Sequence, residues 1–238
     1  MLNFRRTICA AALFIAALSL AAGQEDGSGR ELSVEESYLQ ESVELMIIRE
    51  SSRESSRDQK EVALRYIENA INRGNTGEDV RSALEFLAME GVMSKAREGG
   101  RLVNNYPDVR RKAAEYLGDL GTPEAKDTLI KICVADPEPM VLQEAIKSLG
   151  KIGLNDNEET VAAIAWIVTR FDVLNPDNLL ALSAVDALDK IAAKNNGIKD
   201  PNAIRMLIRI ASGPYIRPVR ERAEQVLENL RKYNAQNQ

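Results

Sequence analysis

The chain reads PDVRRKAAEYLGDLG at residues 107–121, and this stretch sets the pattern of the fold. Its Leu117 aligns with three later leucines, Leu149, Leu188 and Leu227. In each copy an apolar residue stands eight positions before the leucine, an alanine four before it, and a Leu or Ile three after it. These offsets fall on one stripe of an α-helix, which has about 3.6 residues per turn. Four matches at nearly constant spacing indicate a solenoid of helical repeats.

Alanine recurs at one register of the pattern. The four residues are Ala113, Ala145, Ala184 and Ala223. A methyl side chain allows a neighbouring helix to approach closely, as stacked helical hairpins require. Each repeat helix is followed by a start signal for a second helix or the next repeat, in which proline lies just inside the helix. These signals are Thr122-Pro123, Asn175-Pro176 and Asp200-Pro201.

The segment before residue 107 carries weaker copies of the helical pattern. Ser33 and Glu36 form a capping-box sequence. Behind it, an apolar helical face is predicted at Leu39, Val43, Met46 and Ile47, and the polar run 51–56 is expected to break that helix. Further helices are predicted up to Gly74 and over 78–90. No segment after residue 23 shows sustained alternation of β-branched residues, so the predicted fold class is all-α, an α-solenoid (superhelix) of helical hairpins.

The quoted stretch, together with Pro123, Ala125 and Leu129, resembles a HEAT-type repeat. It is most similar to the short bacterial, phycobilisome-lyase-like class. Residues 139–153 form a second good copy, and residues 176–212 a looser one in which Asp189 replaces the first glycine. The resemblance implies divergent N-terminal helical repeats over 33–106, HEAT-like repeats with a C-terminal cap helix over 107–233, and a tail at 234–238.

Residues 1–23 are typical of a secretory signal peptide. Arg5 and Arg6 precede an apolar run, and Ala21 and Gly23 suit a cleavage site before Gln24. Residues 24–32 are then a flexible lead-in. The expected location is the periplasm, with no stable membrane insertion after cleavage. The alternative is an uncleaved anchor in the inner membrane facing the periplasm.

Composition excludes several chemistries. The chain has no histidine, so a Ser-His-Asp triad, a Cys-His pair and His-ligated metals are excluded. A formal charge of −5 argues against a nucleic-acid partner. We therefore expect no catalytic residue, no metal and no cofactor. The acidic run 155–159 is interpreted as helix capping rather than a calcium loop, since it lacks EF-hand spacing. Trp166 is expected in the core or a groove, and Cys133 in the core.

The predicted function is that of a non-catalytic scaffold that binds protein partners on a concave face built from the second helices. The residues expected to be exposed on that face are Lys126, Asp127, Lys131, Arg205 and Arg209. On the helix that carries Arg205 and Arg209, the apolar side is assigned to Ile204, Leu207, Ile208 and Ala211, which turns both arginines outward. Two alternatives remain: a structural component of a cell-envelope assembly, such as a secretion or motility apparatus, and a lyase-like HEAT enzyme.

Charge is distributed unevenly along the chain. Residues 24–60 hold ten acidic and five basic residues, whereas residues 199–238 hold eight basic and four acidic ones. The two ends could therefore meet different partners, or each other in a head-to-tail assembly. The plainer alternative is ordinary solvated surface.

Overall fold

The computed structural model describes residues 33–174 and 176–236. The predicted signal peptide at 1–23 and lead-in at 24–32 lie outside the described residues, as do the last two residues of the predicted tail. The chain divides into two compact units, residues 1–40 and 41–238. Within the described part of the first unit, the predicted capping box is confirmed. The Ser33 amide donates to Glu36 Oε2 (3.0 Å) and the Glu36 amide donates to Ser33 Oγ (3.2 Å), at the start of α2 (Val34–Arg53).

The apolar face predicted for α2 is wrong in register. In the second unit Val43 and Met46 are exposed, and the buried residues of the helix are Glu44, Ile48, Ser51 and Ser52. The helix ends at Arg53, within the polar run 51–56 that was predicted to break it. Ser52 fits inside the helix since its hydroxyl donates to the Arg49 carbonyl, 3.0 Å away.

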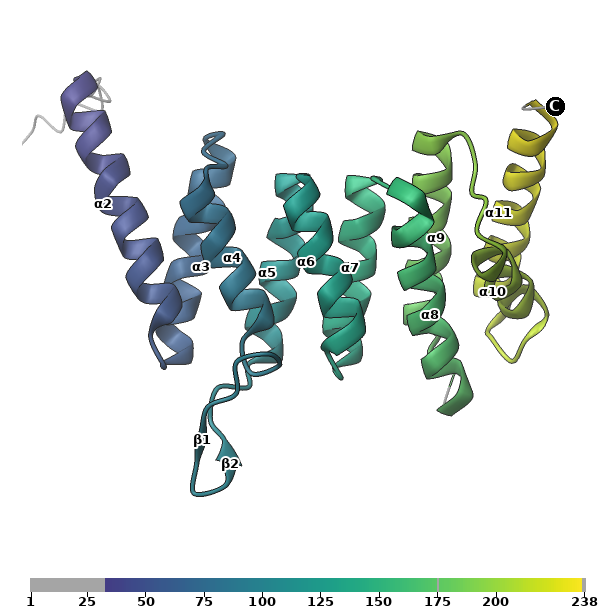
Figure 1. Cartoon of the computed structure of the whole chain (residues 1–238), viewed down its shortest axis with the longest axis horizontal. Coiled ribbons are helices and arrows are strands. Elements are labelled where there is room, and N and C mark those ends of the chain that lie inside the picture. The colour runs from purple at the N-terminus through teal and green to yellow at the C-terminus, as the bar shows by residue number, and fades with distance from the viewer. Residues whose placement is uncertain (1–32, 175, 237–238) are drawn as a thin grey trace, which may run out of the picture. The chain divides into compact units, whose positions relative to one another are not determined.

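The helices of residues 41–238 form two layers (Figure 1). The first-helix layer contains α3 (Arg57–Asn72), α5 (Pro107–Leu120), α7 (Pro139–Ile152), α9 (Asn178–Asn195) and α11 (Arg217–Gln236). The second-helix layer contains α4 (Glu78–Met89), α6 (Pro123–Ala135), α8 (Glu159–Leu174) and α10 (Pro201–Ser212). Each helix packs on the next one in its layer, and each second-layer helix packs on the first-layer helix that follows it. The predicted all-α solenoid of helical hairpins is confirmed.

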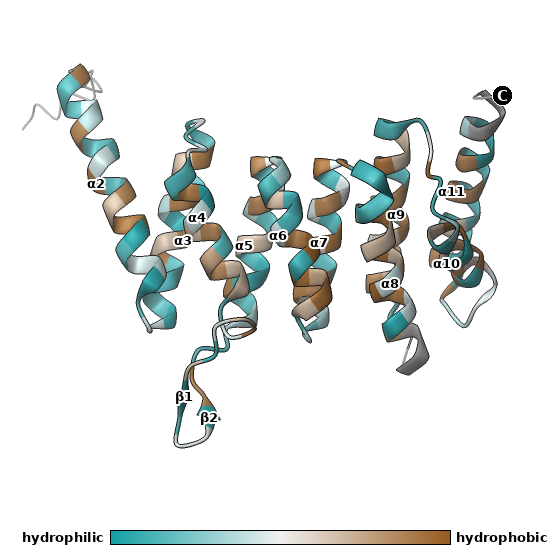
Figure 2. Ribbon diagram, in the orientation of Figure 1, coloured by the Kyte–Doolittle hydropathy of each residue, from teal (hydrophilic) through white to brown (hydrophobic). Residues whose placement is uncertain are grey.

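The repeat register describes the core of this unit. The four alanines of the pattern, Ala113, Ala145, Ala184 and Ala223, are fully buried, and so are the first three leucines. Leu227 in the last helix is only half-buried. Figure 2 shows the resulting division of the helices into apolar and polar sides. Burial of this stripe in successive helices is what joins the repeats into one continuous core.

Two of the three predicted start signals begin helices as expected. Thr122 Oγ1 accepts from the Ala125 amide (3.2 Å), and Asp200 Oδ1 accepts from the Asn202 amide (3.1 Å). The third start is displaced. Asp177 is the N-cap of α9, because its carboxylate accepts from the amides of Leu179 (2.8 Å) and Leu180 (3.0 Å), whereas Asn175 lies outside the described residues.

A buried ion pair closes the hairpin of α5 and α6. Arg110 Nε donates to Asp136 Oδ2 at 2.6 Å and Nη2 to Oδ1 at 3.3 Å, and both side chains are 1% exposed. Asp136 Oδ1 also accepts from the Glu138 amide (2.9 Å), so the carboxylate ties the end of α6 to the start of α7.

A short hairpin between α4 and α5 was not predicted. β1 (Arg97–Glu98) and β2 (Arg101–Leu102) pair in antiparallel fashion around Gly99 and Gly100, both with positive φ. Strands of this length are too short to show alternation, but the Gly-Gly pair is a hairpin signal that was present in the sequence.

Candidate functional site

The outward surface of the second-helix layer carries four of the five predicted binding residues. Asp127 and Lys131 of α6 are exposed, and so are Arg205 and Arg209 of α10. The fifth prediction was wrong, since Lys126 is only 4% exposed.

Lys126 is buried because it joins two helices. Its Nζ lies 3.2 Å from Asp156 Oδ2 and also contacts the Glu159 carboxylate at the start of α8. The hydrogen bond to Glu159 is the main reason that the pKa of Lys126 is raised. This lysine therefore holds α6 against α8, and it is withdrawn from the surface that a partner would meet.

The acidic run 155–159 is used for hydrogen bonds within the fold. Asn155 Oδ1 accepts from the Val161 amide in α8 (3.3 Å). Glu158 Oε2 accepts from the amides of Lys199 (3.1 Å) and Asp200 (3.2 Å), just before α10. Among residues 33–174 and 176–236, no group of three or more His, Cys, Asp or Glu side chains could hold a metal ion.

The buried side of α10 is shifted from the expected one: of the four residues assigned to it, only Leu207 is buried, and Ile204 and Ala211 are partly buried. The buried residues are Ala203, Met206, Leu207 and Ile210, and Ile208 is 53% exposed. A step of one residue turns a helix by about 100°, so Ile208 leaves the buried stripe that is centred on Leu207. The surface beside the two arginines is thus partly apolar.

Trp166 was expected in the core or a groove, and it faces outward with 47% of its surface exposed. The Arg170 guanidinium lies 5.4 Å from the centre of its ring, a cation–π distance. The two side chains border a hollow of about 450 Å³ between α8 and α10, lined by Ala162, Ala165, Trp166, Thr169, Arg170 and Asn202. The spacing of four between Trp166 and Arg170, away from the stripe of Val161, Ile164 and Val168, is the sequence signal that would have found this site.

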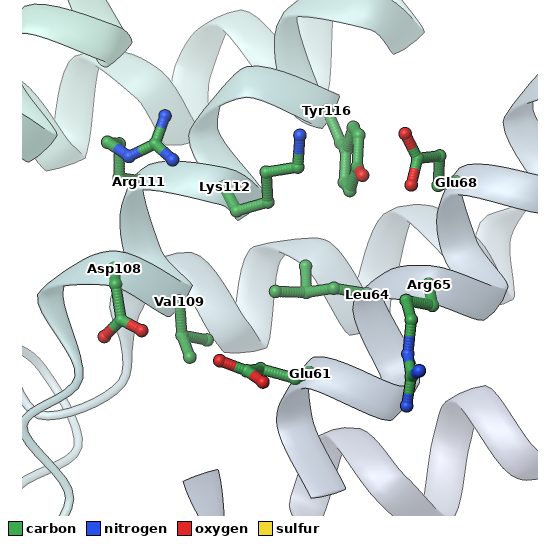
Figure 3. Close-up of a pocket in the computed structure, with 9 residues that line it drawn as sticks. All are labelled: Glu61, Leu64, Arg65, Glu68, Asp108, Val109, Arg111, Lys112 and Tyr116. Carbon is green, nitrogen blue, oxygen red and sulfur yellow. The ribbon is translucent and has the colours of Figure 1, made fainter. Parts of the chain in front are cut away.

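A second hollow, of about 390 Å³, lies in the first-helix layer between α3 and α5. Its apolar residues are Leu64, Val109 and Tyr116, and its charged ones are Glu61, Arg65, Glu68, Asp108, Arg111 and Lys112. Figure 3 shows the Tyr116 hydroxyl directed at Glu68. Burial and the hydrogen bond to Glu68 raise the pKa of Tyr116, and Lys112 Nζ lies 4.7 Å from the centre of its ring.

Glu68 explains why the second hollow exists. It occupies the helix position that is Gly118 in α5 and Gly150 in α7, where the next helix approaches closely. Many charges around the hollow are paired locally: Arg57 with Glu61 (2.7 Å) and Asp108 (2.5 Å), and Lys112 with Glu115 (3.1 Å). The hollow therefore presents mixed charge, unlike the arginine-rich surface of α8 and α10.

Cys133 is fully buried, as predicted, and its burial and the nearby Asp136 charge raise its pKa to about 12. A thiol protonated at neutral pH is a poor nucleophile. Over the ranges 33–174 and 176–236, no helix combines the length and the apolar character needed to cross a membrane.

Comparisons with known proteins agree with this fold. Residues 101–172 match the model of the HEAT repeats family. Among solved structures, the chain is similar to the complex of CpcE and CpcF of phycocyanin lyase from Nostoc sp. PCC7120, with a TM-score of 0.53 and 18% identity. The match covers 79% of this chain and 66% of that one, so the chain spans about two thirds of its length. Residues 101–172 thus match HEAT repeats, and the chain has a solenoid fold similar to that of this complex.

Another solved structure, a de novo designed 16-helix transmembrane nanopore, matches at 17% identity over 82% of this chain and 62% of the other. Its TM-score of 0.18 is too low to indicate a shared fold. No curated protein matches the chain.

Proposed function

We propose that the chain is a non-catalytic, periplasmic HEAT-repeat scaffold that binds protein partners on the outward surface of its second-helix layer. The observation that carries this proposal is the group of exposed residues on α8 and α10, in which Trp166 and Ile208 lie among three arginines, Arg170, Arg205 and Arg209. Tryptophan and arginine are the residue types that dominate binding energy at protein interfaces. Lys131 and Asp127 extend the surface to α6.

A scaffold also fits the chemistry of the described residues. Cys133 is buried and protonated, and the carboxylates of 155–159 are engaged in structural hydrogen bonds. An open surface with an aromatic anchor suits the binding of a protein segment better than that of a small molecule, which needs a closed pocket.

The periplasmic location rests on the sequence of residues 1–23, and it has its own test. A fusion of residues 1–40 to a reporter that is active only in the periplasm should be active, and the mature chain should begin near Gln24. Retention of the full-length protein in the cytoplasm would contradict this part of the proposal.

The binding role is tested by capture from cell-envelope fractions. The mature chain should retain a protein that a variant with Arg205→Glu and Arg209→Glu does not retain. Capture of several transient clients supports the scaffold. One stoichiometric complex would instead support the structural component of an envelope assembly.

A lyase-like activity is a second candidate, because the solved complex with a TM-score of 0.53 is a phycocyanin lyase. Protein purified from its natural source should then carry a chromophore with visible absorbance. Purified protein without such absorbance, which also fails to promote chromophore attachment to phycocyanin, would exclude this candidate.

A further inference from the structure

The hollow between α8 and α10 has the size and lining of a site for one apolar side chain. Ala162 and Ala165 contribute only methyl groups to the lining, and the Trp166 side chain that borders it is 47% exposed. With about 450 Å³ of space and an exposed indole, the hollow can take an aromatic or long aliphatic side chain and remove its surface from water.

Cationic groups lie around this apolar centre. Arg170 lies over the Trp166 ring, at 5.4 Å from its centre. Asn202, on the opposite wall, accepts a hydrogen bond from Arg205 Nη1 (3.4 Å). Arg209 is four residues beyond Arg205 and therefore on the same side of α10. The hollow is thus an apolar site bordered by guanidinium groups, which bind carboxylates with two parallel hydrogen bonds.

We propose that this hollow binds an extended acidic segment of a partner protein, which inserts one aromatic or long aliphatic side chain against Trp166 while its carboxylates meet Arg170 and Arg205. The inference rests on the proposed scaffold function and names the kind of partner. Charge complementarity supports it. Residues 199–212, which include α10, hold three basic residues and one acidic residue, in a chain whose formal charge is −5.

A protein segment fits this surface better than a nucleic acid does. A polyanion lying along the second-helix layer would leave the arginines and meet the exposed carboxylates of Glu159 and Asp127. A short acidic segment with an apolar anchor uses the arginines and the hollow and avoids that repulsion.

The chain offers a direct probe, because Trp166 is its one tryptophan. The experiment titrates the mature chain with a short peptide of Asp and Glu residues around one central Phe, with excitation at a wavelength that selects tryptophan. Binding should shift the Trp166 emission to shorter wavelength in a saturable way. A peptide with Ala in place of the Phe should bind at least tenfold more weakly, and a Lys/Arg peptide with the Phe should not bind.

Variants separate the hollow from other surfaces. The double variant Arg170→Ala and Arg205→Ala should lose at least tenfold in affinity for the Phe peptide. Arg65→Ala, an exposed arginine at the α3/α5 hollow, is the matched control and should retain wild-type affinity. Circular dichroism should show equal helix content in all three proteins, so that loss of binding is not loss of folding.

Several results would overturn the proposal. These are equal affinity for the Phe and Ala peptides, tighter binding of a single-stranded oligothymidylate than of the Phe peptide, and no response to any peptide at millimolar concentration. If one of these results is obtained while the wild-type chain still captures a partner from envelope fractions and the Arg205→Glu, Arg209→Glu variant does not, the scaffold function stands and this partner class does not. A shifted Trp166 emission after deletion of residues 24–32 would assign the hollow to the chain's own acidic segment instead.

Discussion

Gly150 of α7 lies so close to Ala187 of α9 that a Cβ on Gly150 would stand 2.7 Å from the Ala187 Cα and 2.8 Å from its Cβ. Gly118 of α5 has the same relationship with Ser148 of α7, at 2.7 Å from the Ser148 Cβ. In both pairs the glycine directly follows the repeat leucine of its own helix. The small residue that it approaches directly precedes the repeat leucine of the next helix in the layer. The interior repeats therefore stack through a glycine and a small residue.

Replacement of this glycine should destabilise the solenoid. Gly150→Ala improves intrinsic helix propensity by about 1 kcal/mol, yet it places a methyl group inside the backbone and side chain of α9. We expect a net loss of about 1–3 kcal/mol in the free energy of unfolding, as overpacking costs. Urea denaturation measures it, with the exposed Lys147→Ala on the same helix as control. Equal stability of Gly150→Ala and wild type would refute the close approach.

A larger side chain at the repeat alanine should also lower the free energy of unfolding. Ala145 is fully buried in α7, so Ala145→Leu has no space for its added atoms. This variant should lose about 1–3 kcal/mol in the free energy of unfolding. Lys147→Leu lies on the exposed side and should change the unfolding free energy by less than about 0.5 kcal/mol. Similar costs for the two variants would mean that the repeat alignment is wrong.

The repeat core could be predicted from the sequence because its signal is periodic. One stripe recurs in four helices, and burial follows it from Val109 to Leu230. The ends of the solenoid could not be predicted in the same way. At the glycine position, Glu68 in α3 contacts Tyr116, and Asp189 in α9 accepts from Arg222 Nη2 (2.8 Å), so carboxylates separate the end helices. A carboxylate in place of the glycine is specific to one pair of helices, so the periodic pattern of the sequence does not predict the contact that it makes.

Only part of the candidate site could be predicted, because the helical pattern indicates which side chains face outward but not which distant residues contact them. Charged residues off the apolar stripe were expected to face outward, and this holds for Arg205 and Arg209. Lys126 is the exception, because acidic residues 30 and 33 positions away fold back onto it. The buried pair of Arg110 and Asp136 is a similar long-range contact, and hydrophobic periodicity carries no information about either.

Lys126 should therefore affect stability rather than binding. Lys126→Ala removes a buried ammonium group and leaves Glu159 and Asp156, both solvent-exposed carboxylates, without their partner. Because solvent already screens these two carboxylates, we expect a loss of only about 1–2 kcal/mol in unfolding free energy. Asp127→Ala, one residue away and exposed, should be nearly neutral. Thermal melts compare the two, and a stable Lys126→Ala variant that loses partner binding would reverse the assignment.

Cys133 should be protected in the folded chain and should make stability depend on pH. Its pKa is about 12 in the fold against an ordinary value of 9.0, so above pH 9 the folded chain keeps a proton that the unfolded chain releases. The free energy of unfolding should then fall as pH rises from about 9 towards 12. Urea midpoints measured across the mildly alkaline range should fall less steeply for Cys133→Ala than for wild type.

Thiol labelling checks the same group independently. In a chain that begins at Gln24, Cys133 is the one cysteine. Labelling at pH 9 should be slow in buffer and fast in denaturing urea. Equally fast labelling in both conditions would show that the thiol is accessible and that the pH dependence has another origin.

The last prediction concerns the arginines of α10 and the rate of partner binding. Arg205→Glu with Arg209→Glu reverses two exposed charges on the second-helix layer, so it should slow association with a captured acidic partner by about tenfold at low salt. The difference should shrink as added salt screens the charges. Helix content and melting should not change, because neither side chain lies in the buried stripe. The matched control is a double reversal at Glu221 and Glu224, two exposed residues of α11. Stopped-flow association rates decide between the surfaces: if the α11 pair changes the rate and the α10 pair does not, the partner binds the C-terminal helix, and the second-helix layer is not the binding surface.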